Sequence, residues 1–183
     1  WDELTRTLRF VPDFIQGGDA WDVAFLVDDG TETASVTFSI TVNDSISPPV
    51  PEVLTQTEQS THFRLKLSQV SDEYLDSPGY AGRSFEARVV VPKDASLDNK
   101  YPVRVFLHGL GGSPYTAGTG DQFRIYPHDP SNTYWWGYSE QLPGGEPTSG
   151  KVFNYTQRRV LHLLEWVLRT YPGADPERVY VSG

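Results

Sequence analysis

The sequence contains no cysteine and no methionine. Without cysteine the chain cannot form a disulfide, a thiolate zinc site or a cysteine nucleophile, although this absence leaves its compartment open. Basic residues are scarce, because 15 Lys and Arg face 24 Asp and Glu and give a formal net charge of −9. Nucleic acid is therefore not expected as a partner, since binding to a phosphate backbone requires a concentrated basic surface.

Long hydrophobic runs are also missing. The most apolar stretch, residues 160–168, is interrupted by His162 and Glu165, so no membrane span is predicted. The sequence begins at Trp1 without a basic and apolar leader, which indicates a segment cut from a longer polypeptide. Its 183 residues, of which 38% are hydrophobic and 13% aromatic, suffice for one domain or for one domain and a piece of another.

The first 44 residues have the alternation of β-strands. Apolar residues recur with period two in residues 8–10, 21–27 and 36–42, which predicts three antiparallel strands with one buried face. Asp28-Asp29-Gly30 separates the second and third runs and predicts a hairpin turn, because glycine tolerates the positive φ of tight turns. Three strands are too few for an independent sandwich, so this unit is expected to be part of a larger module.

The order of features here resembles the closing half of bacterial cadherin-like repeats. The match rests on the Leu8-Arg9-Phe10-Val11-Pro12 run, Gly17-Gly18-Asp19, Asp29-Gly30 and the closing Val42-Asn43-Asp44. It implies that residues 1–44 are the C-terminal part of such a module in a secreted, multimodular protein; the alternative is any β-sandwich with a hairpin. Asp28, Asp29 and Asp44 carry the hard oxygen ligands that calcium prefers, so either a structural calcium site or solvated loop carboxylates are open interpretations.

A proline-rich linker is expected at residues 45–60, where three prolines stand close together with almost no periodicity. Beyond it, alternation predicts strands at 62–67 and 84–91, and a nearly continuous apolar run predicts a doubly covered strand at 103–107. A short strand at 122–126, one helix at 153–171 with Asn154 and Gln157 as its capping box, and a strand at 178–182 follow. This order predicts an α/β class. His62 is expected at a strand start and His162 on the helix surface.

The sequence His108-Gly109-Leu110-Gly111-Gly112 directly follows the apolar strand. It resembles the loop after the third strand of α/β-hydrolases, which supplies a backbone N–H to the oxyanion hole. The resemblance implies that Leu110 donates this N–H, that Gly109 lets the substrate carbonyl approach, and that His108 supports the loop rather than acting as a base. The alternative is a glycine-rich turn that binds phosphate or nothing.

A second resemblance covers residues 175–183, Asp-Pro-Glu-Arg-Val-Tyr-Val-Ser-Gly. This run is similar to the approach to the nucleophile elbow, Gly-x-Ser-x-Gly, in secreted esterases of the polyhydroxyalkanoate depolymerase and feruloyl esterase kind. Gly183 would be the first glycine of the elbow, with the nucleophilic Ser, the acid and the base His all after it. Ser139 and Ser182 do not fit as substitutes. Residues 61–183 are thus expected to be the N-terminal half of a catalytic domain with a partial α/β-hydrolase fold and a doubly wound, mixed sheet, preceded by the small antiparallel β fragment.

Aromatic residues crowd the segment Thr133–Tyr138. Tyr134, Trp135, Trp136 and Tyr138 present more ring surface than a loop can bury within itself, so the rings either cover the core or form a substrate platform.

Together these patterns predict a secreted bacterial serine esterase that acts on a polyester or an acylated polysaccharide without a cofactor. Its expected partners are a polymeric or small ester substrate and the remainder of its own polypeptide. Two alternatives remain: a peptidase of the prolyl-oligopeptidase type, and a non-catalytic adhesion or carbohydrate-binding protein with a degenerate hydrolase domain.

Overall fold

The computed structural model describes residues 20–43, 50–70, 82–139 and 152–183. The chain divides into two compact units, Trp1–Pro48 and Pro49–Gly183, which are considered separately. The strand expected at residues 8–10 lies outside the described residues.

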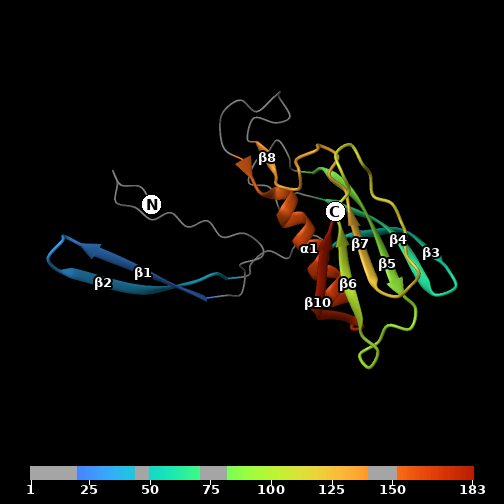
Figure 1. Ribbon diagram of the computed structural model, residues 1–183, viewed down its shortest axis with the longest axis horizontal. Helices are drawn as coiled ribbons and strands as arrows, with labels where there is room; N and C mark the ends of the chain where they lie inside the picture. The colour runs from blue at the N-terminus through green and yellow to red at the C-terminus, as the bar shows by residue number, and fades with distance from the viewer. Residues whose placement is uncertain (1–19, 44–49, 71–81, 140–151) are drawn as a thin grey trace. The chain divides into compact units, whose positions relative to one another are not determined.

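The first unit contains an antiparallel hairpin of β1 (Ala20–Asp28) and β2 (Thr33–Thr41), drawn in blue in Figure 1. This confirms the turn predicted at Asp28-Asp29-Gly30, where Gly30 has φ +87°. Phe25 and Phe38 stack with ring centroids 5.7 Å apart. The expected buried face is wrong for these two strands, because Val27 and Val36 on that face are each at least 60% exposed, and Trp21 and Phe38 are exposed as well. Alternation specifies the two faces of a strand, but only a packed neighbour can bury one of them.

The carboxylates considered for calcium serve the turn itself. Asp28 Oδ1 accepts the Gly30 N–H at 2.7 Å, and Asp29 Oδ1 accepts the Thr31 and Glu32 N–H groups at 2.9 and 2.8 Å. The Glu32 N–H, with further donors on Thr31, lowers the pKa of Asp29 to about 2. Asp44 lies outside the described residues, so a calcium site there stays a prediction.

The second unit is built on a six-stranded mixed sheet with the order β10-β6-β7-β5-β4-β3. The pairs β3–β4, β4–β5 and β5–β7 are antiparallel, whereas the pairs β7–β6 and β6–β10 are parallel. The strands are β3 (Glu52–Glu58), β4 (His62–Val70), β5 (Ser84–Pro92), β6 (Tyr101–Phe106), β7 (Phe123–Pro127) and β10 (Ala174–Ser182). A short pair, β8 (Tyr138–Ser139) and β9 (Val152–Phe153), precedes α1 (Tyr155–Thr170).

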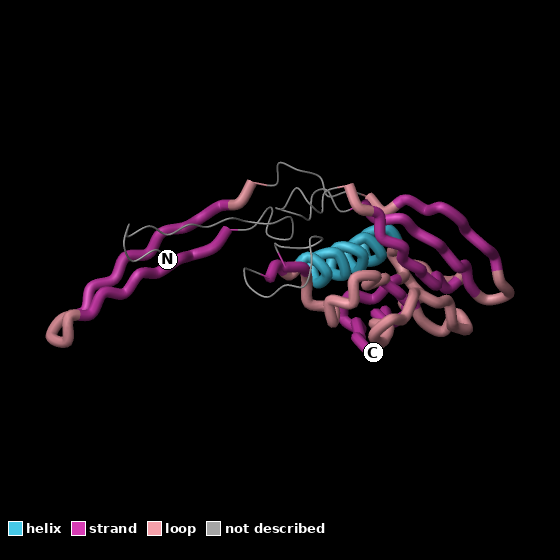
Figure 2. The backbone as a smooth tube through the Cα atoms, turned by 90° about the horizontal axis from the view of Figure 1, so that it is seen from above, coloured by secondary structure: helices cyan, strands magenta, loops and turns pink. Residues whose placement is uncertain are grey.

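Helix α1 lies on one face of this sheet (Figures 1 and 2). Its Leu163, Trp166 and Val167 pack onto alternate apolar residues of β4 to β7, which form the core with them. These strand residues are Leu65, Leu67, Ala87, Val89, Val91, Val103, Val105, Phe123 and Ile125. The helix ends as predicted before Pro172-Gly173, and a Cβ on Gly173 would lie 2.5 Å from the Ser96 nitrogen. Among the described residues, no helix is long and apolar enough to cross a membrane.

After α1 the chain enters β10, which pairs in parallel with β6. The carboxyl ends of these two strands therefore lie side by side. The Leu107 N–H donates to the Ser182 carbonyl at 2.7 Å. The predicted α/β class with a mixed sheet is confirmed for the second unit, and a small antiparallel sheet precedes this unit in the sequence. The carboxyl ends of β6 and β10 form the edge where open α/β sheets bind ligands.

Three local expectations differ from the structure. Residues 52–58, expected in the linker, form β3, an exposed edge strand held by backbone pairing to β4 rather than by apolar alternation. Asn154 occupies the N-cap position of α1, but its side chain makes no capping hydrogen bond. His162 is not on the helix surface, because it is 1% exposed on the face of α1 that packs against the sheet.

Candidate active site

The glycine-rich loop after β6 is organised by a tight turn. The Gly112 N–H donates to the Gly109 carbonyl at 2.9 Å, with Leu110 and Gly111 as the central residues. Gly111 has φ +70°, which is the conformation that a type II turn requires at this position. Within the described residues, the Leu110 N–H has no hydrogen-bond acceptor, and the Leu110 side chain is 71% exposed. The Leu110 N–H, which the resemblance implied as the oxyanion donor, is thus free to bind a ligand atom.

Two glycines of the site are fixed by close approach. A Cβ on Gly112 would lie 2.8 Å from the Gly109 carbonyl oxygen and 2.9 Å from His108 Nδ1. A Cβ on Gly183 would lie 3.3 Å from the Leu107 carbonyl oxygen. The structure therefore places Gly183 beside the start of the glycine-rich loop, although 76 residues separate Leu107 and Gly183 in the sequence.

His108 uses both ring nitrogens within the fold. Its Nδ1 lies 2.9 Å from the Gly109 carbonyl, which can only accept, so Nδ1 carries the proton. Its Nε2 accepts the Asp129 backbone N–H at 3.1 Å. The neutral ring joins the loop after β6 to the loop after β7 and has no lone pair left for proton transfer. These contacts support the loop-supporting role expected for His108.

Asp129 fixes the start of the aromatic segment Thr133–Tyr138 through hydrogen bonds. Its carboxylate is 3% exposed, and Oδ2 accepts the Thr133 N–H at 2.7 Å, the Thr133 hydroxyl at 3.1 Å and the Trp135 N–H at 3.4 Å. The Thr133 hydroxyl also lies 3.0 Å from that of Thr156 in the first turn of α1. One buried carboxylate thereby connects the loop after β7, the aromatic segment and the helix.

The aromatic residues divide into different environments. Trp135 is partly buried: its indole N–H donates to the His108 carbonyl at 3.0 Å, and its ring meets His108 edge-on at 4.8 Å. Tyr134 and Trp136 are 79% and 55% exposed. Tyr138 lies in β8 rather than in a loop, paired with Phe153. Tyr134 and Trp135 have φ of +55° and +63°, a conformation that costs non-glycine residues energy and that the Asp129 contacts maintain.

A cavity of about 180 Å³ opens beside the free Leu110 N–H. Its lining consists of His108, Gly109, Leu110, Asp129, Asn132, Tyr134 and Trp135. The structure thus brings together five of the predicted site residues, while Trp136, Tyr138 and Gly183 do not line this cavity. Asn132 fixes one wall, because its side-chain oxygen accepts the Gly111 N–H at 2.8 Å.

Sequence reasoning missed Asp129 and Asn132. Their signal lies in the His128-Asp129-Pro130 run followed by Asn132 and Thr133, a pattern in which short polar side chains bind nearby backbone N–H groups. His128 lies 5.5 Å from His108 between ring centroids, and burial lowers the pKa of His128, with the positive charge of Arg159 adding to the effect. Among the described residues, no three His, Asp or Glu side chains gather closely enough to hold a metal ion.

No family model matches the sequence, and no curated protein matches it. Solved structures do resemble it. One is a chain of Bacteroides fragilis to which acetyl xylan esterase activity is attributed, with 12% identity and a TM-score of 0.47 over 76% of this chain and 43% of that one. Another is a thermostable esterase, with 17% identity and a TM-score of 0.38 over 93% of this chain and 61% of that one. The chain thus spans less than two thirds of either neighbour's length.

Proposed function

We propose that residues 61–183 are the N-terminal half of the catalytic domain of a serine-type carboxylic ester hydrolase. The observation that carries the proposal is the free Leu110 N–H in a rigid turn, next to the strand end at Gly183. An ester carbonyl in the cavity would accept this hydrogen bond, and negative charge that develops on its oxygen would be stabilised there. A serine two residues after Gly183, in a Gly-x-Ser-x-Gly elbow, would attack the carbonyl carbon.

The neutral, fully bonded His108 supports this division of roles. A base for the serine would need a free ring nitrogen, so the proposed base is a different histidine, located after Gly183. Ser182 is not the proposed nucleophile either, because it lies within β10 before the expected elbow and its hydroxyl is held on the sheet by the Arg104 Nε–H at 2.9 Å.

The finer proposals are secretion by a bacterium, a polyester or acylated polysaccharide as substrate, and a cadherin-like origin of the first unit. The exposed ring of Tyr134, which lines the cavity, and that of nearby Trp136, which is also exposed, support a polymeric substrate, because an apolar surface suits a chain that extends beyond the scissile bond.

The test uses Leu110→Pro in a polypeptide that contains the entire catalytic domain. Proline suits the second position of a type II turn, so the loop is retained while the N–H is removed. We expect kcat on an activated aryl ester to fall by about 10²- to 10³-fold, as for loss of one oxyanion donor. Leu110→Ala keeps the N–H and serves as the matched control, with kcat changed less than about threefold. Full activity of Leu110→Pro, or a sequence after Gly183 without Ser at the second position, would refute the proposal.

A further inference from the structure

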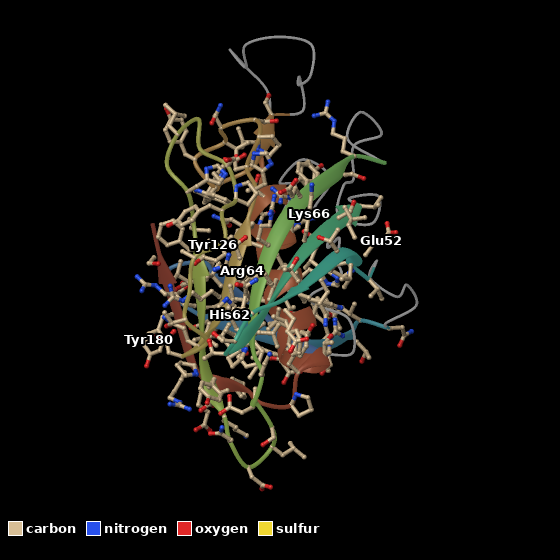
Figure 3. The ribbon with its side chains drawn as sticks, turned by 90° about the vertical axis from the view of Figure 1, so that its right-hand side faces the viewer. Glu52, His62, Arg64, Lys66, Tyr126 and Tyr180 are labelled. Atoms are coloured by element: carbon tan, nitrogen blue, oxygen red, sulfur yellow. The ribbon has the colours of Figure 1, made fainter. Side chains whose placement is uncertain are left out.

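The face of the sheet opposite α1 carries five basic residues in an otherwise acidic chain, and Glu86 on the same face forms ion pairs with two of them, Lys66 and Arg88. Because Leu65 and Leu67 face the core, the alternating Arg64 and Lys66 face away from α1; Figure 3 shows them together with His62 and Tyr126 on the side turned to the viewer. The registers of the neighbouring strands continue this pattern. The basic residues of this face are Arg64, Lys66, Arg88, Arg104 and Arg124.

Two arginines adjoin at the centre of this face. Arg104 and Arg124 are directly paired positions on the parallel strands β6 and β7, and both line a hollow of about 100 Å³ that is open to solvent. Arg124 has a carboxylate 3.2 Å away on Asp121, which is itself 59% exposed. In the part of the chain that the structure describes, no carboxylate lies within ion-pair distance of Arg104.

Arg104 is oriented by a neutral partner. Its Nε–H donates to the Ser182 hydroxyl at 2.9 Å, and no described acceptor engages its two terminal amino groups. A guanidinium held at Nε keeps the planar fork that binds a carboxylate through two parallel hydrogen bonds.

The other walls of the hollow are aromatic. Phe106 lies 5.3 Å from Tyr115 and 5.7 Å from Tyr126, and the two tyrosines are 5.0 Å apart, between ring centroids. The Tyr126 hydroxyl donates to the Ala117 carbonyl at 2.6 Å, which joins the loop after β6 to the sheet. Tyr126 is buried, whereas Tyr115 is 47% exposed and forms an accessible rim.

We propose that this hollow, the arginine hollow, binds a small planar aromatic carboxylate. The carboxylate would occupy the Arg104 fork, with Arg124 adding positive charge, and the ring would lie against Tyr115 and Phe106. Six residues line the arginine hollow: Arg104, Phe106, Tyr115, Ala117, Arg124 and Tyr126. None of them lines the cavity beside Leu110, so the site does not depend on the proposed esterase activity.

The test is a titration of the 183-residue chain with benzoate, followed by calorimetry and by amide chemical shifts. We expect saturable binding, with benzamide, the neutral molecule of the same shape, and acetate, which lacks the ring, both at least tenfold weaker. Arg104→Gln should weaken benzoate at least tenfold, and Arg104→Lys should lie between that variant and the parent chain, since lysine keeps the charge but loses the fork. Arg64→Gln is the matched control on the same face, outside the arginine hollow, and should change affinity less than twofold.

Three results would overturn the proposal. Equal losses from Arg64→Gln and Arg104→Gln would show that only the general field of this face attracts anions. Equal affinity for acetate and benzoate would remove the role of the rings. Unchanged binding by Tyr115→Ala, a change at an exposed rim residue that the fold should tolerate, would place benzoate elsewhere.

Discussion

Three neighbouring glycines in the loop after β6 should respond very differently to alanine. At Gly109, a Cβ meets no atom within 4 Å and φ is not positive, so Gly109→Ala should leave stability unchanged or raise it by up to about 1 kcal/mol through the unfolded state. At Gly111 there is equal space, but φ is +70°, so alanine should cost about 1–2 kcal/mol.

Gly112→Ala should be the most damaging of the three. Its Cβ would contact the Gly109 carbonyl oxygen and His108 Nδ1, two atoms that are hydrogen-bonded to each other. Relief requires breaking the turn or moving the His108 ring, and overpacking of this kind costs about 2–3 kcal/mol. The loss should also loosen the contact between His108 and the Asp129 N–H, and thereby the aromatic loop.

Urea unfolding of the 183-residue chain, followed by tryptophan fluorescence, measures these differences. The expected order of midpoints is Gly109→Ala at or above the parent chain, then Gly111→Ala, then Gly112→Ala. A Gly112→Ala variant as stable as Gly109→Ala would refute the loop geometry described above, because of these three glycines Gly112 alone lacks room for a methyl group.

Three further predictions concern the surroundings of this loop. Asp129→Ala should lower the free energy of unfolding by about 2–4 kcal/mol, because it leaves the N–H groups of Thr133 and Trp135 without their buried acceptor. Urea unfolding measures this loss, and Asp121→Ala, at an exposed carboxylate, is the control with an expected loss under about 1 kcal/mol. Equal losses in the two variants would contradict the role of Asp129. Burial lowers the pKa of His62 below its ordinary value of 6.5, so the unfolded chain binds a proton more readily and stability should fall as the pH drops below about 6.5; His62→Gln should reduce this fall in the urea midpoint, and an unchanged pH dependence would count against it. In the whole enzyme, Trp136→Ala should lower kcat/KM on a polymeric ester about tenfold, with little change in kcat/KM on a short ester or in Tm, since the ring is exposed. An equal loss of kcat/KM on both substrates would contradict a substrate platform at Trp136.

The sequence predicts the α/β class because β4, β5 and α1 carry clear apolar periodicity. It also locates the Leu110 turn, since glycines with positive φ or close contacts leave a local signature. It does not reveal β3, whose residues are exposed throughout and pair with β4 through the backbone. Periodicity cannot register a strand that has no buried face.

The site is less predictable than the fold, because its connections are remote in sequence. Asp129 matters through His108, 21 residues earlier, and through the Thr133 contact with Thr156, 23 residues later. Only the folded chain shows that Trp135 packs on His108 while Trp136 faces solvent. Adjacent tryptophans in one run carry no sequence signal that separates these roles.

The pairing of β10 with β6 has a consequence for the order of folding. The antiparallel pairing of β4 and β5 brings together Val70 and Ser84, 14 positions apart in the sequence, whereas Arg104 and Ser182, hydrogen-bonded across β6 and β10, are 78 positions apart. Contacts of such long range form slowly, because the entropy of loop closure is lost before the pairing can compensate for it. The edge of the sheet that carries Leu110 and Gly183 should therefore be completed late, after α1 has docked. Until then, nascent chains expose the unpaired side of β6 to chaperones and to one another.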